Sequence, residues 1–374
     1  MNPDPYPADI PGDRFAIDGA LIEAAATGSG HIHDTYTASY RAPDGTVRRY
    51  IHQRLNQTVF PDPPALMETI CRVTNHIRAK LEEAGAHDME RRVLTVIPAR
   101  DQRPFLRDAS GAYWRTYRLI EHAHSLDRVS APEQAREAAR ALGQFQCFLA
   151  DLPAPRLKET IPVFHNTPAR FEALREAIEQ DRYRRADGAA KEIAFIVERS
   201  AFMGILLEQQ RAGEMPERIT HNDTKINNVL FDQATGEALC LIDLDTVMPG
   251  LALYDFGDLV RTAASSAAED EQDLSKVRVR MDLFDALTEG YLSAAHAFLN
   301  RTEIAHLAIA GKLIALETGI RFLTDHLNGD RYFKVARLNH NLDRARNQLK
   351  LVESMDAQKE EMERRVRTAA DRYC

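Results

Sequence analysis

The chain has 374 residues, of which 44% are apolar and 28% charged, and this composition is typical of a soluble globular protein. Its length is sufficient for two domains and a large core. The formal net charge of −8 argues against nucleic-acid binding, which depends on clustered cations that meet phosphates. No apolar run approaches the roughly 20 residues of a membrane-spanning helix, so no membrane partner is expected.

Two further features predict a cytoplasmic location. The first residues, MNPDPYPADIPGD, are acidic and proline-rich and lack the cationic and apolar regions of a signal peptide. The four cysteines (Cys71, Cys147, Cys240 and Cys374) lie far apart, three of them in apolar surroundings. This spacing predicts reduced thiols and not a disulfide framework.

The first part of the chain predicts a small sheet with one helix. After an irregular arm, residues 21–55 indicate strand, glycine loop, strand, turn and strand, with the turn at 42–45. A helix is expected over 65–84, because its apolar residues recur on one face. Strands are expected at 94–97 and 113–120. We assign these elements to a first lobe, residues 1–120.

The rest of the chain, residues 121–374, predicts a larger and mainly helical lobe. A polar loop between two short strands interrupts the helices at 218–243. A small β-rich lobe followed by a helical lobe predicts an α+β fold. Helical apolar spacing is found at 131–150, 168–183 and 189–211 and again from Tyr254 onward, and the charged segment 339–372 is expected to form a solvated packing helix.

The loop THNDTKINNVLFD, from Thr220 to Asp232, carries the clearest chemical signal. Asp223 and Asn228 lie five residues apart, and an apolar run leads to Asp243 twenty residues beyond Asp223. Phosphoryl transfer needs a carboxylate that deprotonates the acceptor hydroxyl, followed by an Asn and an Asp that hold metal on the nucleotide phosphates. The pattern H-x-D-x-x-x-x-N therefore predicts a kinase, with Asp223 as base and with Asn228 and Asp243 as Mg²⁺ ligands.

Other polar residues of this region are expected to assist catalysis or to hold the loop in place. Lys225 is expected to neutralise charge on the transferred phosphoryl group, and His221 to brace the loop through a backbone hydrogen bond. Asp245 would share one side of a continuing strand with Asp243, as a second metal-shell carboxylate, or it would cap the loop through Thr246. Asp255 and Asp258 fit structural roles, in which Asp255 is expected to tie the following helix to the loop, and the role of Asp258 stays open.

Residues in the first lobe predict a nucleotide site. Gly28 and Gly30 lie between two strands, where glycine lets the backbone approach phosphate closely. Protein kinases place a lysine on the third strand, but the first lysine of this chain is Lys80. Arg54 is the expected substitute, with Glu68 as its ion-pair partner. A shift of one residue would direct Gln53 to the nucleotide instead.

The catalytic loop, together with IDLDTVMPGLALYDFGD (242–258), resembles the aminoglycoside phosphotransferase superfamily of small-molecule kinases. Within it, GSGHIHDTY (28–36), YIHQRLNQTVFPDPPALME (50–68) and RFLTDHLNGDRYFK (321–334) are most similar to the N-acetylhexosamine 1-kinases. The resemblance covers both lobes. It implies a bilobal protein-kinase-like fold, with ATP and Mg²⁺ as cofactors in a cleft between the lobes.

The resemblance also implies a sugar acceptor that is phosphorylated on its anomeric hydroxyl. The related kinases often carry Asn where this chain has His33, which leaves a substrate contact there open. Asn166 is either a sugar ligand or a helix N-cap, and Asn222 contacts either the sugar or the loop backbone. The candidate sugar contacts are His33, His165, Asn166, Asn222, Arg321 and Asp325.

Other functions remain as alternatives at this stage. The same fold serves kinases of other small alcohols, such as an aminoglycoside, choline or homoserine. A nucleotide-binding module without catalysis is disfavoured, because it would be free to lose the three loop residues. A protein kinase is disfavoured because the segment between Asp243 and Asp255 is too short for an activation loop. The chain is expected to be a monomer or homodimer.

Overall fold

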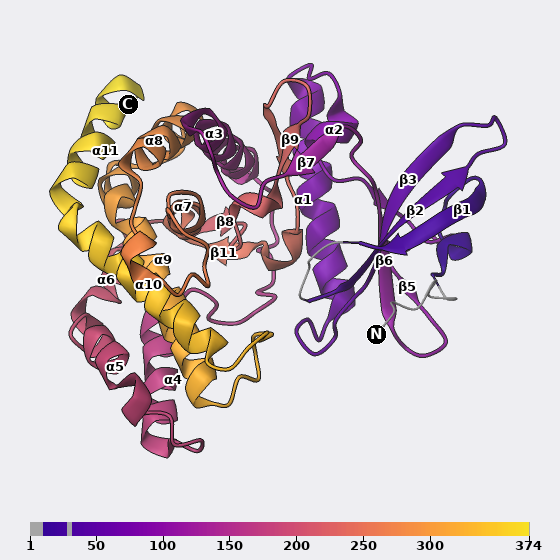
Figure 1. Ribbon diagram of the computed structural model, residues 1–374. Coiled ribbons are helices and arrows are strands. Elements are labelled where there is room, and N and C mark those ends of the chain that lie inside the picture. The colour runs from indigo at the N-terminus through magenta and orange to yellow at the C-terminus, as the bar shows by residue number, and fades with distance from the viewer. Residues whose placement is uncertain (1–9, 28–31, 374) are drawn as a thin grey trace. The chain divides into compact units, whose positions relative to one another are not determined.

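The computed structural model describes residues 10–27 and 32–373 (Figure 1). Contacts divide the chain into two compact units, one of residues 1–123 and 152–161 and one of residues 124–151 and 162–374. The first unit holds the largest sheet and the second is mainly helical, which confirms the predicted α+β fold class. Along the described ranges, no helix combines the length and apolar character needed to cross a membrane.

The first unit is built on an antiparallel sheet with strand order β1-β2-β3-β6-β4, in which β5 also pairs with β6. Alternate residues of its strands face a core that includes Phe15, Tyr40, Tyr50 and Trp114. The elements are β1 (Ala20–Ala26), β2 (Asp34–Arg41), β3 (Val47–Arg54), α1 (Pro63–Glu83), α2 (Met89–Arg92), β4 (Val96–Ile97), β5 (Leu106–Arg107) and β6 (Tyr113–Arg118).

Local sequence explains the first unit well. The β2–β3 hairpin turns at residues 42–46, where Gly45 has a φ of 86° and Asp44 accepts a hydrogen bond from the Thr46 N–H. Helix α1 begins after Asp62, whose side chain accepts a hydrogen bond from the Ala65 N–H. The prolines at its first two positions fit a helix start, so the predicted helix is confirmed with slightly earlier bounds.

The second unit surrounds the long helix α9, which packs against α7, α10 and α4. Gly257 lets α7 approach α9 closely, because an added Cβ would lie 2.6 Å from the Ala310 carbonyl oxygen. The helices are α3 (Pro132–Leu149), α4 (Thr167–Gln180), α5 (Ala190–Val197), α6 (Ile205–Arg211), α7 (Ala252–Ala263), α8 (Met281–Ala295), α9 (Arg301–Leu327), α10 (His340–Ala357) and α11 (Lys359–Tyr373).

Short strands frame the polar loop, and all of their residues belong to the second unit except Ala123, the first residue of β7. They form a three-stranded sheet in the order β10-β9-β7 and a separate β8–β11 pair. The β8–β11 pairing was not predicted, because each strand is only three residues long. The strands are β7 (Ala123–Ser125), β8 (Arg218–Thr220), β9 (Val229–Asp232), β10 (Ala238–Leu241) and β11 (Met248–Gly250).

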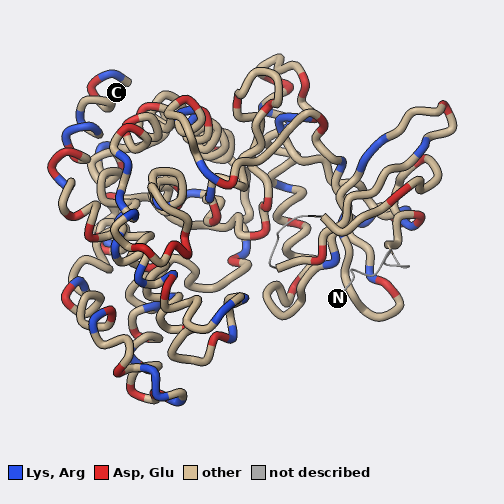
Figure 2. The backbone as a smooth tube through the Cα atoms, viewed as in Figure 1, with Lys and Arg blue, Asp and Glu red and all other residues tan. Residues whose placement is uncertain are grey.

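Two segments that were each predicted to be one helix form two helices instead. The segment 189–211 is interrupted by a 3₁₀ turn at Ser200–Phe202 and by Gly204, a weak helix former, and so forms α5 and α6. The segment 339–372 breaks at Gln358, where φ is −114°, and forms α10 and α11. Acidic and basic residues are mixed along α11, as Figure 2 shows.

Candidate active site

The polar loop joins β8 to β9 and contains a short 3₁₀ turn, η4 (Ile226–Asn228). Asn222 has a φ of 64°, and Asp243, which follows β10, has the same φ. Both lie in the left-handed region, where Asn and Asp are tolerated better than other non-glycine residues. The backbone turns sharply at these two positions, one directly before the predicted base Asp223 and one at the predicted metal ligand Asp243.

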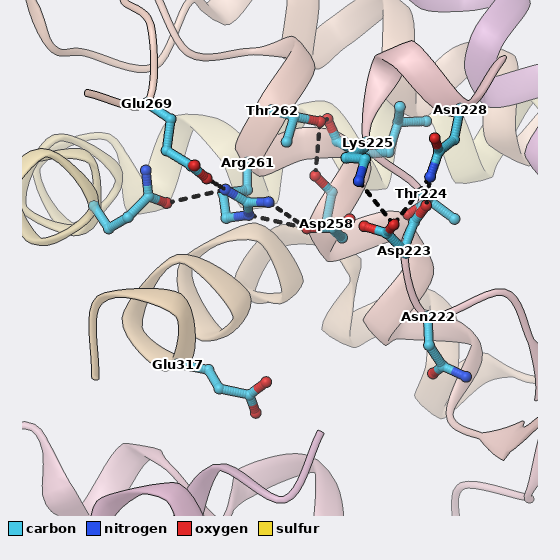
Figure 3. A network of polar contacts seen from close by, with 12 residues as sticks. Asn222, Asp223, Thr224, Lys225, Asn228, Asp258, Arg261, Thr262, Glu269 and Glu317 are labelled. Carbon is cyan, nitrogen blue, oxygen red and sulfur yellow. Dashed lines mark hydrogen bonds and ion pairs between the residues drawn. The ribbon is translucent and has the colours of Figure 1, made fainter. Parts of the chain in front are cut away.

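The Asp223 carboxylate is the centre of the loop (Figure 3). One of its oxygens lies 2.9 Å from Lys225 Nζ and 3.0 Å from Asn228 Nδ2. Burial raises the pKa of Asp223, but Lys225, His221 and the hydrogen bond from Asn228 together hold this pKa below its usual value. The carboxylate is therefore ionised and able to accept a hydrogen bond from a hydroxyl group.

Lys225 interacts electrostatically with three carboxylates. Burial lowers its pKa, but the charges of Asp223, Asp243 and Asp258 raise it above the usual value. Lys225 is thus a fixed positive charge beside the predicted base. A positive charge at this position can stabilise the negative charge that develops during phosphoryl transfer.

The donor set suits Mg²⁺. The Asn228 Nδ2 donates to the carbonyl oxygen of Asp223 at 2.8 Å as well as to its carboxylate, so the amide oxygen faces away from Asp223. Mg²⁺ is usually held by one or two carboxylates together with phosphate oxygens and water, and Asn228 with Asp243 can supply that share. Within the described ranges, no group of three or more His, Cys, Asp or Glu side chains forms a metal cage.

The expectation that Asp243 and Asp245 share a side of one strand was wrong. Strand β10 ends at Leu241, and residues Leu244–Thr246 form a 3₁₀ turn, because the left-handed Asp243 redirects the chain. Asp245 is buried, with 3% of its surface exposed. Thr246 Oγ1 donates to the His221 carbonyl at 2.7 Å, so this turn braces the loop.

Asp255 on α7 holds the backbone of the loop. Its carboxylate accepts the N–H of His221 at 2.8 Å and that of Asn222 at 2.7 Å, and it also accepts Gln146 Nε2 at 2.8 Å. The His221 Nε2 lies 2.9 Å from the Ile242 carbonyl. The predicted bracing roles of Asp255 and His221 are both confirmed.

Asp258 has a different set of partners from Asp255. Its carboxylate contacts Arg261, at 2.9 Å from Nε and 2.8 Å from Nη2, and Arg261 also binds Glu269 (Figure 3). Burial lowers the pKa of Arg261, but the carboxylates of Asp258 and Glu269 raise it well above its usual value. Asp258 thus anchors α7 to the segment that follows it.

The first unit places the nucleotide candidates as follows. Gly28 and Gly30 lie outside the described residues. Arg54 is 2.8 Å from Asp34, its partner across the β2–β3 hairpin, so the predicted ion pair with Glu68 was wrong. The error arose because sequence spacing did not reveal the strand register. Glu68 is exposed on α1.

Gln53 and a buried arginine lie together on neighbouring strands. Arg115 on β6 is 1% exposed, and its Nε donates to Gln53 Oε1 at 2.8 Å. Gln53 in turn donates to Thr35 at 3.0 Å. Sequence reasoning missed Arg115, because nothing in YWRTYR distinguishes a buried arginine from a surface one.

Most of the candidate sugar contacts are engaged by the protein itself. Asn166 caps α4 through the Ala169 N–H at 3.0 Å, which confirms the N-cap alternative. The Asn222 side chain binds the backbone at Thr246, at 2.8 Å, and at Thr220. His33 Nδ1 accepts the Asn56 N–H at 3.0 Å. Asp325 accepts the N–H groups of residues 331–333 at 2.8 to 3.0 Å.

Arg321 and His165 lie in one cluster of the second unit. The Arg321 guanidinium carbon lies 5.0 Å from the Phe164 ring centre and 5.6 Å from that of Phe333. His165 contacts Phe164 and is bound by Glu317 on α9. Sequence reasoning missed Glu317, although a single acid in the apolar stretch IALETGI could have signalled a buried ion pair.

A β-sheet unit, a helical unit and a His-x-Asp loop followed by Asn and Asp place the chain in the kinase-like class of phosphotransferases. The phosphotransferase enzyme family matches residues 46–289, more than half of the chain, and the chain belongs to this family.

Similar solved structures agree with the fold. An aminoglycoside phosphotransferase from Alicyclobacillus acidocaldarius shares 14% identity, with a TM-score of 0.60 over 96% of this chain and 95% of that one. The microcompartment-associated aminopropanol kinase shares 16%, with a TM-score of 0.58 over 94% and 96%. The amicoumacin kinase hAmiN, in complex with AMP-PNP, Ca²⁺ and Ami, shares 14%, with a TM-score of 0.54 over 89% and 88%.

Proposed function

We propose that the protein is an ATP- and Mg²⁺-dependent kinase that phosphorylates the anomeric hydroxyl of an N-acetylhexosamine or related hexose. The observation that carries the phosphoryl-transfer part is the ionised Asp223 carboxylate, bound by Lys225 and Asn228 on the family's loop. The sugar part rests on the resemblance of three segments to the N-acetylhexosamine 1-kinases. The structure of hAmiN in complex with AMP-PNP, an analogue of ATP, supports ATP as the nucleotide.

The reaction follows from the positions of the loop residues. Asp223 accepts a hydrogen bond from the acceptor hydroxyl and takes its proton as the oxygen–phosphorus bond forms. The bond between the γ-phosphorus and the bridging oxygen breaks, and ADP leaves with the electron pair. Lys225 supplies a positive charge beside Asp223 that offsets the negative charge of the transferred phosphoryl group during the reaction.

Asn228 and Asp243 are the residues that would hold Mg²⁺ through oxygen atoms. When bound, the ion supplies positive charge that orients and neutralises the nucleotide phosphates. In the first unit, Arg54 and Glu68 stay proposals for nucleotide contact, as do Gly28 and Gly30. Asp245 stays a proposed outer contributor to the metal site.

The charge around Arg321 favours a neutral polar acceptor over a cationic one. Burial and the charge of Arg321 both lower the pKa of Arg170, while Glu317 and Tyr332 act in the opposite direction. Across the described residues, Arg321 has ring contacts but no hydrogen bond or ion pair assigned to it. Its donors suit hydroxyl and acetamido oxygens, whereas a protonated amine would be repelled.

The direct test is an ADP-release assay with ATP and Mg²⁺ over N-acetylglucosamine, N-acetylgalactosamine, glucose, galactose, kanamycin, choline, aminopropanol and homoserine. Phosphorus NMR of the product locates the phosphate. Turnover of an N-acetylhexosamine with an anomeric phosphate is the expected result. Turnover of only an amine-bearing alcohol would keep the kinase chemistry and reject the sugar.

A loop variant serves as the control for this assay. Asp223→Asn removes the base but leaves the Asn228 and Asp243 oxygens in place, so turnover should fall at least about a thousandfold. ATP binding, measured by calorimetry, should persist. Near-normal turnover in this variant would refute the assignment of Asp223.

A further inference from the structure

A buried ionisable pair lies next to the segment that leads into Asp223. The side chains of His165 and Glu317 are 5% and 1% exposed, and His165 Nδ1 is 2.8 Å from Glu317 Oε1. His165 Nε2 is 3.2 Å from the carbonyl oxygen of Asn222. The second oxygen of Glu317 accepts the Thr167 hydroxyl at 2.7 Å. Figure 3 shows Glu317 on its helix and Asn222 next to Asp223 on the loop.

The proton count of this arrangement defines its charge. A carbonyl oxygen only accepts hydrogen bonds, and so does an ionised carboxylate. Burial raises the pKa of Glu317, but the charges of His165 and Arg321 and the hydrogen bonds from His165 and Thr167 hold this pKa below its usual value, so Glu317 is ionised. Both ring nitrogens of His165 therefore face acceptors, and the pair is an imidazolium and a carboxylate. A neutral His165 beside the ionised Glu317 would carry one N–H and would leave either Asn222 or Glu317 without a donor.

The charged surroundings of His165 agree with this count. Burial lowers the pKa of His165, but Glu317 outweighs burial and raises the pKa above its usual value. Asp258 on α7 acts in the same direction, and Arg321 on α9 opposes it. Tyr254 on α7 lies against the imidazole, with ring centres 5.0 Å apart.

We propose that His165, held by Glu317, is a positioning residue that fixes the peptide between Asn222 and Asp223. Asn222 has its N–H bound by Asp255 and its carbonyl bound by His165, so both of its peptide groups are fixed although its φ is 64°. The inference rests on the proposed function, in which Asp223 is the base. This positioning role replaces the predicted role of His165 as a sugar contact, because both of its ring nitrogens already bind the protein.

The position of the pair connects the acceptor side to the catalytic loop. Arg321 follows Glu317 by four residues on α9, so the two side chains lie on one helix face. Phe164 contacts both Arg321 and His165. An acceptor bound at Arg321 would therefore rest on the same cluster that orients the base.

The test compares three variants by turnover, with folding checked by circular dichroism. His165→Phe removes both donors, and we expect kcat to fall about a hundredfold, because small displacements of a reacting group cost that much. The KM for ATP should stay within about twofold of wild type, since the change removes transition-state orientation alone. His165→Gln keeps one donor toward Asn222 and should recover to within about tenfold.

His340→Phe is the matched control. His340 is buried in the same unit, 3.2 Å from Asp270, and accepts the Ala336 N–H. It does not bind the loop, so its loss should reduce stability without changing kcat. Equal losses of kcat in His165→Phe and His340→Phe would overturn the proposal, as would unchanged kcat in His165→Phe.

The pH profile separates positioning from packing. Wild-type turnover should decline as pH rises through the raised pKa of His165, because the neutral ring loses one donor. His165→Gln does not titrate, so this alkaline decline should be absent from its profile. An identical alkaline decline in both proteins would overturn the role of the charged pair.

Hydrogen exchange distinguishes failure of this inference from failure of the proposed function. If wild type phosphorylates no acceptor, the proposed function fails, but exchange at the amides of residues 221–225 still reports the loop. These amides should exchange at least about tenfold faster in His165→Phe and stay unchanged in His340→Phe. Unchanged exchange in His165→Phe would overturn the inference whatever the assay shows.

Discussion

Asp255 gives the sharpest quantitative prediction, because its carboxylate satisfies three buried donors. In Asp255→Ala, the N–H groups of His221 and Asn222 and the side-chain amide of Gln146 lose their acceptor. Each unpaired buried donor costs about 1–3 kcal/mol. The free energy of unfolding should therefore fall by at least about 3 kcal/mol.

Asp255→Asn is the milder variant. Its amide keeps one acceptor oxygen and turns an NH₂ group toward donors, so one or two of the three donors lose their partner. We expect a loss of about 1–3 kcal/mol in the free energy of unfolding for each donor left unpaired. Turnover should fall about a hundredfold, since the backbone on the N-terminal side of Asp223 is no longer fixed.

The measurement is urea unfolding followed by far-UV circular dichroism, because the only tryptophan, Trp114, lies in the first unit. Asp325→Asn is the control for stability, because Asp325 also accepts three backbone N–H groups. It should lose similar stability. If Asp255→Ala lost less than about 1 kcal/mol, the reasoning from unpaired donors would be refuted.

Two further predictions concern the first unit. Arg54→Ala should raise the KM for ATP about tenfold with kcat little changed, as for a phosphate contact; an unaltered KM would move the phosphate contact to another residue. His52 is buried with a pKa lowered to about 4 by burial, so the unfolded chain binds more protons between pH 6.5 and 4. Stability should fall as pH falls through this window, by about 2 kcal/mol between pH 6.5 and 5. His52→Gln should remove that loss, and an equal loss in both proteins in urea unfolding would contradict it.

Features set by neighbouring residues were predictable from sequence. The turn at Gly45, the start of α1 and the Asn166 cap all depend on residues within a few positions of one another. The same holds for the loop itself, where Asp223, Lys225 and Asn228 lie within six residues and meet in space. Short spacing restricts the geometry enough for such predictions.

Features set by distant residues were not predictable. The pairing of Arg54 with Asp34 depends on the hairpin register, which no local pattern revealed. The direction of Asp245 depends on the left-handed φ of Asp243, and spacing does not report backbone conformation. Arg115 reads as an ordinary charged residue until its burial is known.

The candidate site depends on neighbouring residues of the loop and also on distant residues that hold the loop. The loop carries the groups proposed to react, and residues more than thirty positions away hold its backbone, Asp255 through N–H groups and His165 through a carbonyl. Asn222 carries a left-handed φ that costs about 1–3 kcal/mol, and such a conformation persists only where the surrounding structure holds it, as the two buried partners do here. The motif alone therefore identifies the reaction class. We expect efficient turnover to depend on buried polar groups outside the motif, and one of them, His165, contacts Phe164, which also contacts Arg321.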